Sequence, residues 1–429
     1  MSAAAKPDSI LRRELQLVDV FTITTGAMIS SGLFILPGIA FEKAGPAVIL
    51  SYFLAGLLAL PTMLCAAELA TAMPRAGGVY FFASRSLGFG IGTVAGFARW
   101  FAMSLKCAFS LIGIGVFSSA LTGADPAAVS IGTGLLFIGV NLAGIRLVGW
   151  TQTLLTGALG VLLITIAASG LPEISADRYT PFAPYGLGPV FSTAGFIFIS
   201  YGGMLSITGL AEEVRRPRRN IPLGMLLALA FTGTMYALVI AVAVGTLDPE
   251  SLKNTLTPIS DSTSSYLGRA GIFLTTAAAL LAFVTTANAG IAAASRYPLA
   301  MSRDGLLPAC FKRSRESTGI PHVSVLATGG FVLGAVLLLK LDMLVEVASS
   351  LLLLTYILTN FAVIVMRRRN KEDYRPAFRV PLCPWLPLAS SAGLALLLAK
   401  ISAFSFLFIL LFVCAVLVWR ALYARHLSA

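Results

Sequence analysis

The sequence is poor in histidine and in charged residues, and both shortages exclude classes of function. Its only histidines are His322 and His426, and no two of its five cysteines have Cys-x-x-Cys spacing. We therefore predict no metal site, no cofactor, no disulfide framework and no membrane-embedded enzyme, which would need a constellation of histidine, aspartate or cysteine. Charged residues make up only 12% of the chain, whereas soluble domains carry about 25%. A soluble protein is not expected.

Long apolar runs take the place of the missing charge. The chain is 57% hydrophobic, with a mean hydropathy of +0.88. A helix that crosses a bilayer needs about 20 apolar residues. The sequence predicts an all-α polytopic membrane protein with twelve transmembrane helices, near 18–41, 46–72, 89–121, 128–145, 150–170, 189–211, 222–247, 267–298, 322–340, 343–366, 384–401 and 403–424.

The basic residues indicate how these helices are oriented. The net charge of +12 comes from short clusters between apolar runs, which is not the pattern of a nucleic-acid surface. With twelve spans, 23 of the 31 lysines and arginines share a side with both termini, and six lie in the opposite loops. Because basic loops stay in the cytoplasm, we expect a multi-pass protein of the cell membrane with both termini cytoplasmic.

Two predicted helices are interrupted near their centres by glycine and hydroxyl residues. The interruptions are Gly26–Phe34, with the sequence GAMISSGLF, and Ser200–Gly209, with the sequence SYGGMLSITG. Irregular backbone at membrane depth is tolerated where it is buried in protein or lines a cavity. Either patch alone is also consistent with close packing of small residues. The two lie five spans apart, which favours an inverted repeat with a transport site at the midplane.

Broken helices supply the groups that bind a zwitterion. The free N–H groups that start the second half of the first helix, at Ser31 and Gly32, suit a carboxylate. The carbonyl groups that end its first half, chiefly Met28, suit an ammonium group. Carbonyls of the sixth helix near Ile199 and Gly202 would join them.

Five sequence motifs follow one another in an order typical of one superfamily. They are Gly26–Phe34 with Leu36 and Pro37, Glu68–Tyr80, Ala211–Pro222, Asn288–Pro308 and Phe378–Leu382. In these motifs the chain resembles the amino acid–polyamine–organocation (APC) superfamily of secondary transporters. The resemblance implies a leucine-transporter-like 5+5 inverted repeat with discontinuous helices 1 and 6, and an α-amino acid or close relative as substrate.

The same resemblance implies a division of the chain and a side-chain pocket. A cytoplasmic segment (1–17) would precede the first repeat (18–170), the second repeat (189–366) and the last two helices (384–424). The pocket would be lined by Ala102, Met103, Lys106, Cys107, Ile199, Tyr201, Met204 and Gly290. The arginine/agmatine antiporter branch has a tryptophan where Ile199 aligns, so a cation-stacking aromatic residue is missing here.

Lys106 is the most informative single residue. It lies near the middle of a long apolar helix, about 25 Å from either end at 1.5 Å per residue. A charge at such depth usually faces a cavity or a partner. Three roles stay open: a cation that attracts acidic and repels basic substrates, a group that couples transport to protons, or a structural partner of Glu346, Glu68 or helix-end carbonyls. Arg99, two turns nearer the cytoplasm, is expected to snorkel.

Thr285 and Thr286 would face the carbonyls near Ala27 in this fold. Such hydroxyls contribute to sodium sites. Alternatively, a threonine hydroxyl donates a hydrogen bond to a carbonyl of its own helix and has no role in ion binding.

We therefore predict a transporter, as antiporter or symporter, of a small amino acid, with neutral or acidic substrates favoured. It would work by alternating access, in contact with the lipid bilayer. The alternatives are a cationic amino acid or polyamine exchanger and an amino-acid sensor on a transporter scaffold. The sequence leaves open coupling to protons, sodium or a counter-substrate, and assembly as a homodimer.

Overall fold

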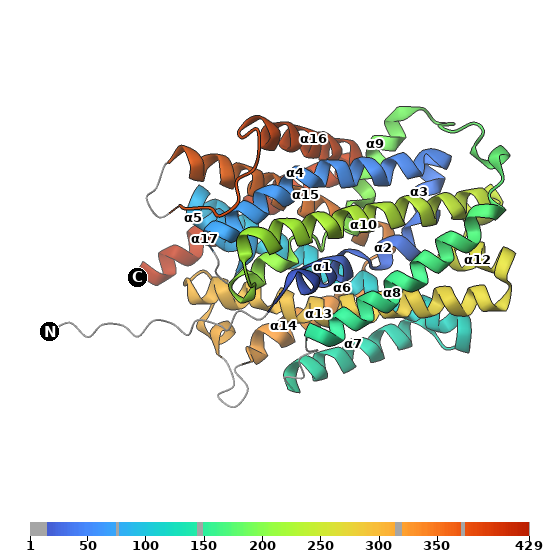
Figure 1. The fold of residues 1–429 in the computed structure, drawn as a ribbon. Helices are drawn as coiled ribbons and strands as arrows, with labels where there is room; N and C mark the ends of the chain where they lie inside the picture. The colour runs from blue at the N-terminus through green and yellow to red at the C-terminus, as the bar shows by residue number, and fades with distance from the viewer. Residues whose placement is uncertain (1–14, 74–76, 144–148, 314–319, 370–373, 429) are drawn as a thin grey trace.

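The computed structural model describes residues 15–73, 77–143, 149–313, 320–369 and 374–428, and its regular structure is helical. The long helices run side by side as one bundle (Figure 1). In the described part of the chain, nine helical stretches are long and apolar enough to cross a membrane, and three more apolar helices have 10–17 residues. The prediction of a polytopic all-α membrane protein is confirmed.

The long helices match the predicted apolar runs closely. Ser402 has extended backbone and separates the last two helices, at the point where the sequence offered only a short polar interruption. The helices of the bundle are α1 (Leu17–Met28), α2 (Ser31–Phe34), α3 (Leu36–Ala44), α4 (Val48–Ala72), α5 (Gly78–Leu87), α6 (Phe89–Thr122), α7 (Pro126–Ala143), α8 (Gly149–Gly170), α9 (Leu187–Phe196), α10 (Pro217–Thr246), α11 (Pro249–Lys253), α12 (Pro258–Leu267), α13 (Arg269–Arg303), α14 (His322–Leu338), α15 (Leu341–Arg368), α16 (Trp385–Ile401) and α17 (Ala403–Ser428).

The first predicted interruption is present. Helix α1 ends at Met28, Ile29 and Ser30 have extended backbone, and α2 begins at Ser31. A second bend at Ile35 separates α2 from α3, which carries Pro37 in its first turn. Proline is tolerated in a first turn because the N–H that it lacks has no intrahelical partner there.

The second predicted interruption is also present. Helix α9 ends at Phe196 and continues as a 3₁₀ segment over Ile197–Tyr201. A turn of four residues leads to another 3₁₀ segment, Ser206–Glu213. Tighter 3₁₀ geometry leaves poorer hydrogen bonds than an α-helix, so this region depends on partners from neighbouring helices.

The interrupted helices lie inside the bundle. In Figure 1, α1 and α2 occupy its middle, between α10 and α13, and α6 packs along α13 and α15. At one end of the bundle, Leu15 pairs with the chain after the second interruption: its N–H donates to the Glu213 carbonyl (2.9 Å), and its carbonyl accepts from Arg215 N–H (2.8 Å). The two broken helices are therefore held together at that end.

Candidate functional site

The two interruptions touch each other through glycine. A Cβ atom built on Gly203 would overlap the carbonyl group of Ala27 and come within 2.7 Å of the Met28 nitrogen. A Cβ on Gly32 would overlap the Ser200 side chain, coming within 2.8 Å of its Cβ. Only glycine permits this approach, so the unwound part of the first helix lies directly against that of the second.

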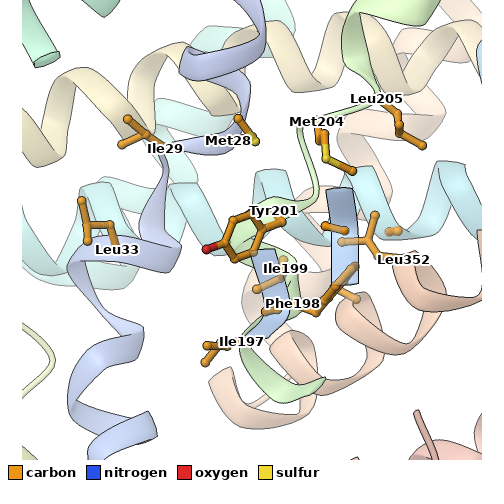
Figure 2. Packing of buried hydrophobic residues seen from close by; sticks show 14 of the residues in the cluster. Met28, Ile29, Leu33, Ile197, Phe198, Ile199, Tyr201, Met204, Leu205 and Leu352 are labelled. Carbon is orange, nitrogen blue, oxygen red and sulfur yellow. The ribbon is translucent and has the colours of Figure 1, made fainter. Parts of the chain in front are cut away.

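Side chains around the contact are closely packed. Figure 2 shows Met28 on one segment lying beside Met204 on the other, with Tyr201 between the two segments. Met28, Leu33 and Met204 are fully buried, and Ile199 is 1% exposed. The broken helices are therefore closed around their point of contact in this conformation.

Polar side chains of neighbouring helices cap the free carbonyls of the first break. Lys106 Nζ on α6 donates to the Ala27 carbonyl (2.8 Å), and the Tyr52 hydroxyl on α4 donates to that of Gly32 (2.7 Å). The Tyr236 hydroxyl on α10 lies 3.0 Å from the Met28 carbonyl. Backbone groups in a membrane must be satisfied within the protein, and these donors meet that requirement.

The second break is capped in the same way. Ser349 on α15 bridges it, donating to the Phe196 carbonyl (2.6 Å) and accepting from Ile199 N–H (3.0 Å). The Tyr356 hydroxyl donates to the Tyr201 carbonyl (2.9 Å). Arg99 Nη2 donates to the Gly202 carbonyl (3.1 Å).

Lys106 faces the first break and not a carboxylate. Its side chain is buried, and the described residues place no acidic group in an ion pair with it. The predicted carboxylate partners are wrong: Glu68 pairs with Arg367 on α15, and Glu346 accepts from Ser402 and Ser405. The predicted contact with a helix-end carbonyl is confirmed by Ala27.

The expectation for Arg99 is wrong. Its side chain does not reach the surface but is 1% exposed. Depth along α6 did not reveal this, because snorkelling requires the side chain to face lipid or the helix end, and Arg99 faces the second break.

Comparisons with known proteins agree with this architecture. The amino acid permease family model matches residues 15–423. The chain belongs to the amino acid permease family. This places it in the APC superfamily, as its motifs predicted, and identifies it as a transmembrane transporter.

The permease has relatives with different named substrates. It is 30% identical to the methylthioribose transporter of Bacillus subtilis over 428 residues, covering 92% of this chain and 89% of that protein. It is 31% identical over 402 residues to the vacuolar cationic amino acid transporter 4 of Arabidopsis thaliana, covering 87% of this chain and 65% of that longer protein. It is 27% identical to the branched-chain amino acid permease BcaP of Bacillus subtilis, covering 92% and 88%.

The other predicted site residues of the permease lie on α6, on α13 and in the second break, and they differ in what they contact. Cys107 lies against Gly290 of α13, whose added Cβ would overlap its sulfur. Ala102 is fully buried on α6, whereas Met103 is half-buried. The Tyr201 hydroxyl points to α4, where it donates to the Tyr52 carbonyl (2.9 Å).

The two threonines differ from each other. The Thr285 hydroxyl donates within α13, to the carbonyls of Leu281 (2.8 Å) and Ala282 (3.0 Å), as expected of an ordinary helix residue. The Thr286 hydroxyl is buried and has no hydrogen-bond partner among the described residues, as is also true of the Ser31 and Ser200 hydroxyls beside the breaks.

The capping tyrosines and Ser349 were not predicted from the sequence. Their signal was present: Tyr52, Tyr236 and Tyr356 are isolated hydroxyl-bearing rings within long apolar runs. A buried tyrosine usually finds a partner for its hydroxyl, so each marks a polar target at membrane depth.

Tyr236 joins the two breaks, and removing its hydroxyl should weaken the permease. The hydroxyl lies 3.0 Å from the Met28 carbonyl and 3.2 Å from the Ser200 carbonyl, so its proton is shared between them. Tyr236→Phe leaves both buried acceptors without this donor, which costs about 1–3 kcal/mol. Chemical unfolding of purified protein checks this against Tyr185→Phe, which changes an exposed ring. Equal stability of the two variants would contradict the bridging role.

Proposed function

We propose that this permease is a secondary active transporter of small neutral or acidic amino acids in the cell membrane, with both termini cytoplasmic. The observation that carries the proposal is the contact of two interrupted helices at Ala27 and Gly203, with the cations Lys106 and Arg99 on their carbonyls. Paired broken helices are the usual sites of substrate binding in secondary transporters.

The proposed architecture has twelve membrane-spanning helices. The nine long stretches and three shorter apolar helices support this number. Residues 18–170 and 189–366 form the two inverted repeats, each beginning with a broken helix, and 384–424 form two further helices. Alternating access follows from movement of one group of helices against the other around the central site.

The amino-acid headgroup binds at the breaks. Its carboxylate lies at the start of α2, where the Ser31 hydroxyl has no hydrogen-bond partner within the described part of the chain and the first N–H groups of a helix are free. Its ammonium lies toward the Met28 and Ile199 carbonyls, because the Gly202 carbonyl, which the sequence also suggested, accepts from the Arg99 guanidinium. The Met28 carbonyl already accepts from Tyr236, but a carbonyl oxygen has two lone pairs and can accept again.

The substrate side chain extends toward α6 and α13. The residues assigned to this pocket are Ala102, Met103, Lys106, Cys107, Ile199, Tyr201, Met204 and Gly290. Lys106 and Arg99 make the region positive, and like charges within a site repel one another. Arginine, lysine and polyamines are therefore disfavoured as substrates, although one relative is named as a cationic amino acid transporter.

Coupling is assigned to groups at the first break. Lys106 can release and take up a proton beside the Ala27 carbonyl. Alternatively, a sodium ion binds to the hydroxyls of Thr285 and Thr286, of which the latter has no hydrogen-bond partner among the described residues. Exchange against a second amino acid needs neither a proton nor a sodium ion.

Competition for uptake tests the proposal. Purified protein in liposomes takes up a labelled amino-acid mixture against unlabelled neutral, acidic and basic amino acids, polyamines and methylthioribose. We expect acidic or neutral amino acids to compete best. Lys106→Met should weaken that preference about 10- to 100-fold, because charge-assisted hydrogen bonds contribute about 1.5–3 kcal/mol.

Lys340→Met provides the matched control, because Lys340 is exposed at the start of α15. It should leave the ranking of competitors unchanged. If arginine or polyamines compete best, and Lys106→Met keeps that ranking, the substrate assignment is wrong and Lys106 has a structural role only.

A further inference from the structure

Arg99 is the largest of the fully buried side chains, and it is incompletely paired. Its Nη2 donates to the Gly202 carbonyl (3.1 Å), and the Tyr356 hydroxyl lies beside the guanidinium. The Nε and Nη1 atoms are buried with no hydrogen-bond partner among the described residues. Most of the planar donor fork is therefore available.

No carboxylate in the described structure balances this charge. Of the acidic residues on α4, on α15 and at the end of α13, Glu68 binds Arg367, Asp304 accepts from Tyr80 (2.5 Å) and Glu346 accepts from Ser405 (2.6 Å), while Asp342 is exposed at the start of α15. Burying an ion costs several kcal/mol unless it is paired and hydrogen-bonded. The unused donors therefore indicate an anion that binds during the transport cycle.

The position of Arg99 limits what that anion is. It lies seven residues before Lys106, which is two helical turns or about 10 Å on the same face of α6. The α6 residues around it are the small, fully buried Ala95, Ala98 and Ala102. Its partner Gly202 lies two residues after Ser200, which contacts Gly32 at the first break. A headgroup at that break thus leaves Arg99 within reach of its side chain.

We propose that Arg99 binds a second carboxylate on the substrate, so that the permease selects dicarboxylic amino acids over their amides. A guanidinium presents parallel N–H donors that match a carboxylate in two-pronged geometry. The inference rests on the proposed function and names its substrate class. An inorganic anion such as chloride has the same charge and is the competing occupant.

Ligand-induced thermal stabilisation of the wild-type protein is the first test. A ligand that binds only the folded state raises stability by an amount set by its concentration and Kd. In chloride-free buffer, glutamate and aspartate should bind about 10- to 100-fold more tightly than glutamine and asparagine, as expected for charge-assisted hydrogen bonds. Equal or weaker binding of the acids overturns the inference without any variant.

Arg99→Gln is the second test, because the amide keeps a donor for the Gly202 carbonyl but loses the charge. It should abolish the preference for the acids while glutamine and asparagine bind as in wild type. Arg99→Lys keeps the charge without the fork and should retain part of the preference. Arg85→Gln makes the same change at an exposed residue of α5 and should change nothing.

The possible failures are distinguishable. If neutral amino acids bind to wild type and the acids do not, the assignment to Arg99 fails while the proposed function stands. If no amino acid binds, the proposed function itself fails. If chloride alone stabilises wild type but not Arg99→Gln, and the acid-to-amide ratio is unchanged, Arg99 holds an inorganic ion and the inference is wrong.

Discussion

Gly203→Ala is expected to abolish transport. The added methyl group would overlap the Ala27 carbonyl and approach the Met28 nitrogen within 2.7 Å. Both are backbone atoms, which cannot rotate away as a flexible side chain can. The broken helices would have to separate, and Lys106 would lose its carbonyl partner. Uptake into liposomes should fall to the background rate, and unfolding should occur at a lower temperature.

Gly209→Ala is the matched control, in the 3₁₀ segment that follows the turn containing Gly203. A Cβ at Gly209 meets no atom within 4 Å, so this change tests the loss of a glycine without the clash. It should transport at close to the wild-type rate. If both variants retain transport, the close contact of the two interruptions is not required and the proposed site is misplaced.

Glu68→Ala is expected to produce the largest loss of stability. Glu68 is fully buried on α4 and accepts four hydrogen bonds: from Arg367 Nε (2.9 Å) and Nη2 (2.5 Å), the Tyr374 hydroxyl (2.8 Å) and Val380 N–H (2.6 Å). Burial, together with the Glu68 charge, raises the pKa of Tyr374, so its hydroxyl keeps the proton that it donates. One carboxylate thereby joins α4, the end of α15 and the chain before α16.

Removing that carboxylate leaves a partly buried guanidinium and several donors unpaired. Breaking a buried ion pair costs about 3–5 kcal/mol, and the Arg367 side chain is 26% exposed, so we expect about 3 kcal/mol. Unfolding of the purified protein by denaturant measures this. A Glu68→Gln and Arg367→Gln double variant should recover part of the loss, because no charge is left unpaired.

Glu250→Ala is the control for an exposed pair. Glu250 and Lys253 form a salt bridge of 2.8 Å in which the Glu250 side chain is 74% exposed. Such pairs contribute about 0–1 kcal/mol. Equal destabilisation by Glu68→Ala and Glu250→Ala would show that the buried interactions of Glu68 stabilise the protein no more than an exposed ion pair does.

Features of this protein that arise from local chemistry could be predicted from its sequence. Apolar length predicted the helices, and glycine with serine predicted the interruptions within Gly26–Phe34 and Ser200–Gly209, of which the second begins at Ile197, slightly earlier than predicted. Both signals can be recognised from residues that are neighbours in the sequence. An apolar run needs lipid or protein around it, and a broken helix needs residues with poor helix propensity. The motifs also indicated the family correctly.

Which groups satisfy the interruptions depends on how helices that are distant in the sequence pack together. Lys106 meets the Ala27 carbonyl, 79 residues earlier in the chain, and Arg99 meets that of Gly202. Position along a helix gives the depth of a residue, but the packing of neighbouring helices decides which side chain faces a free carbonyl. The expected carboxylate partners of Lys106 and the snorkelling of Arg99 were wrong for that reason, since both depend on atoms that distant segments bring together.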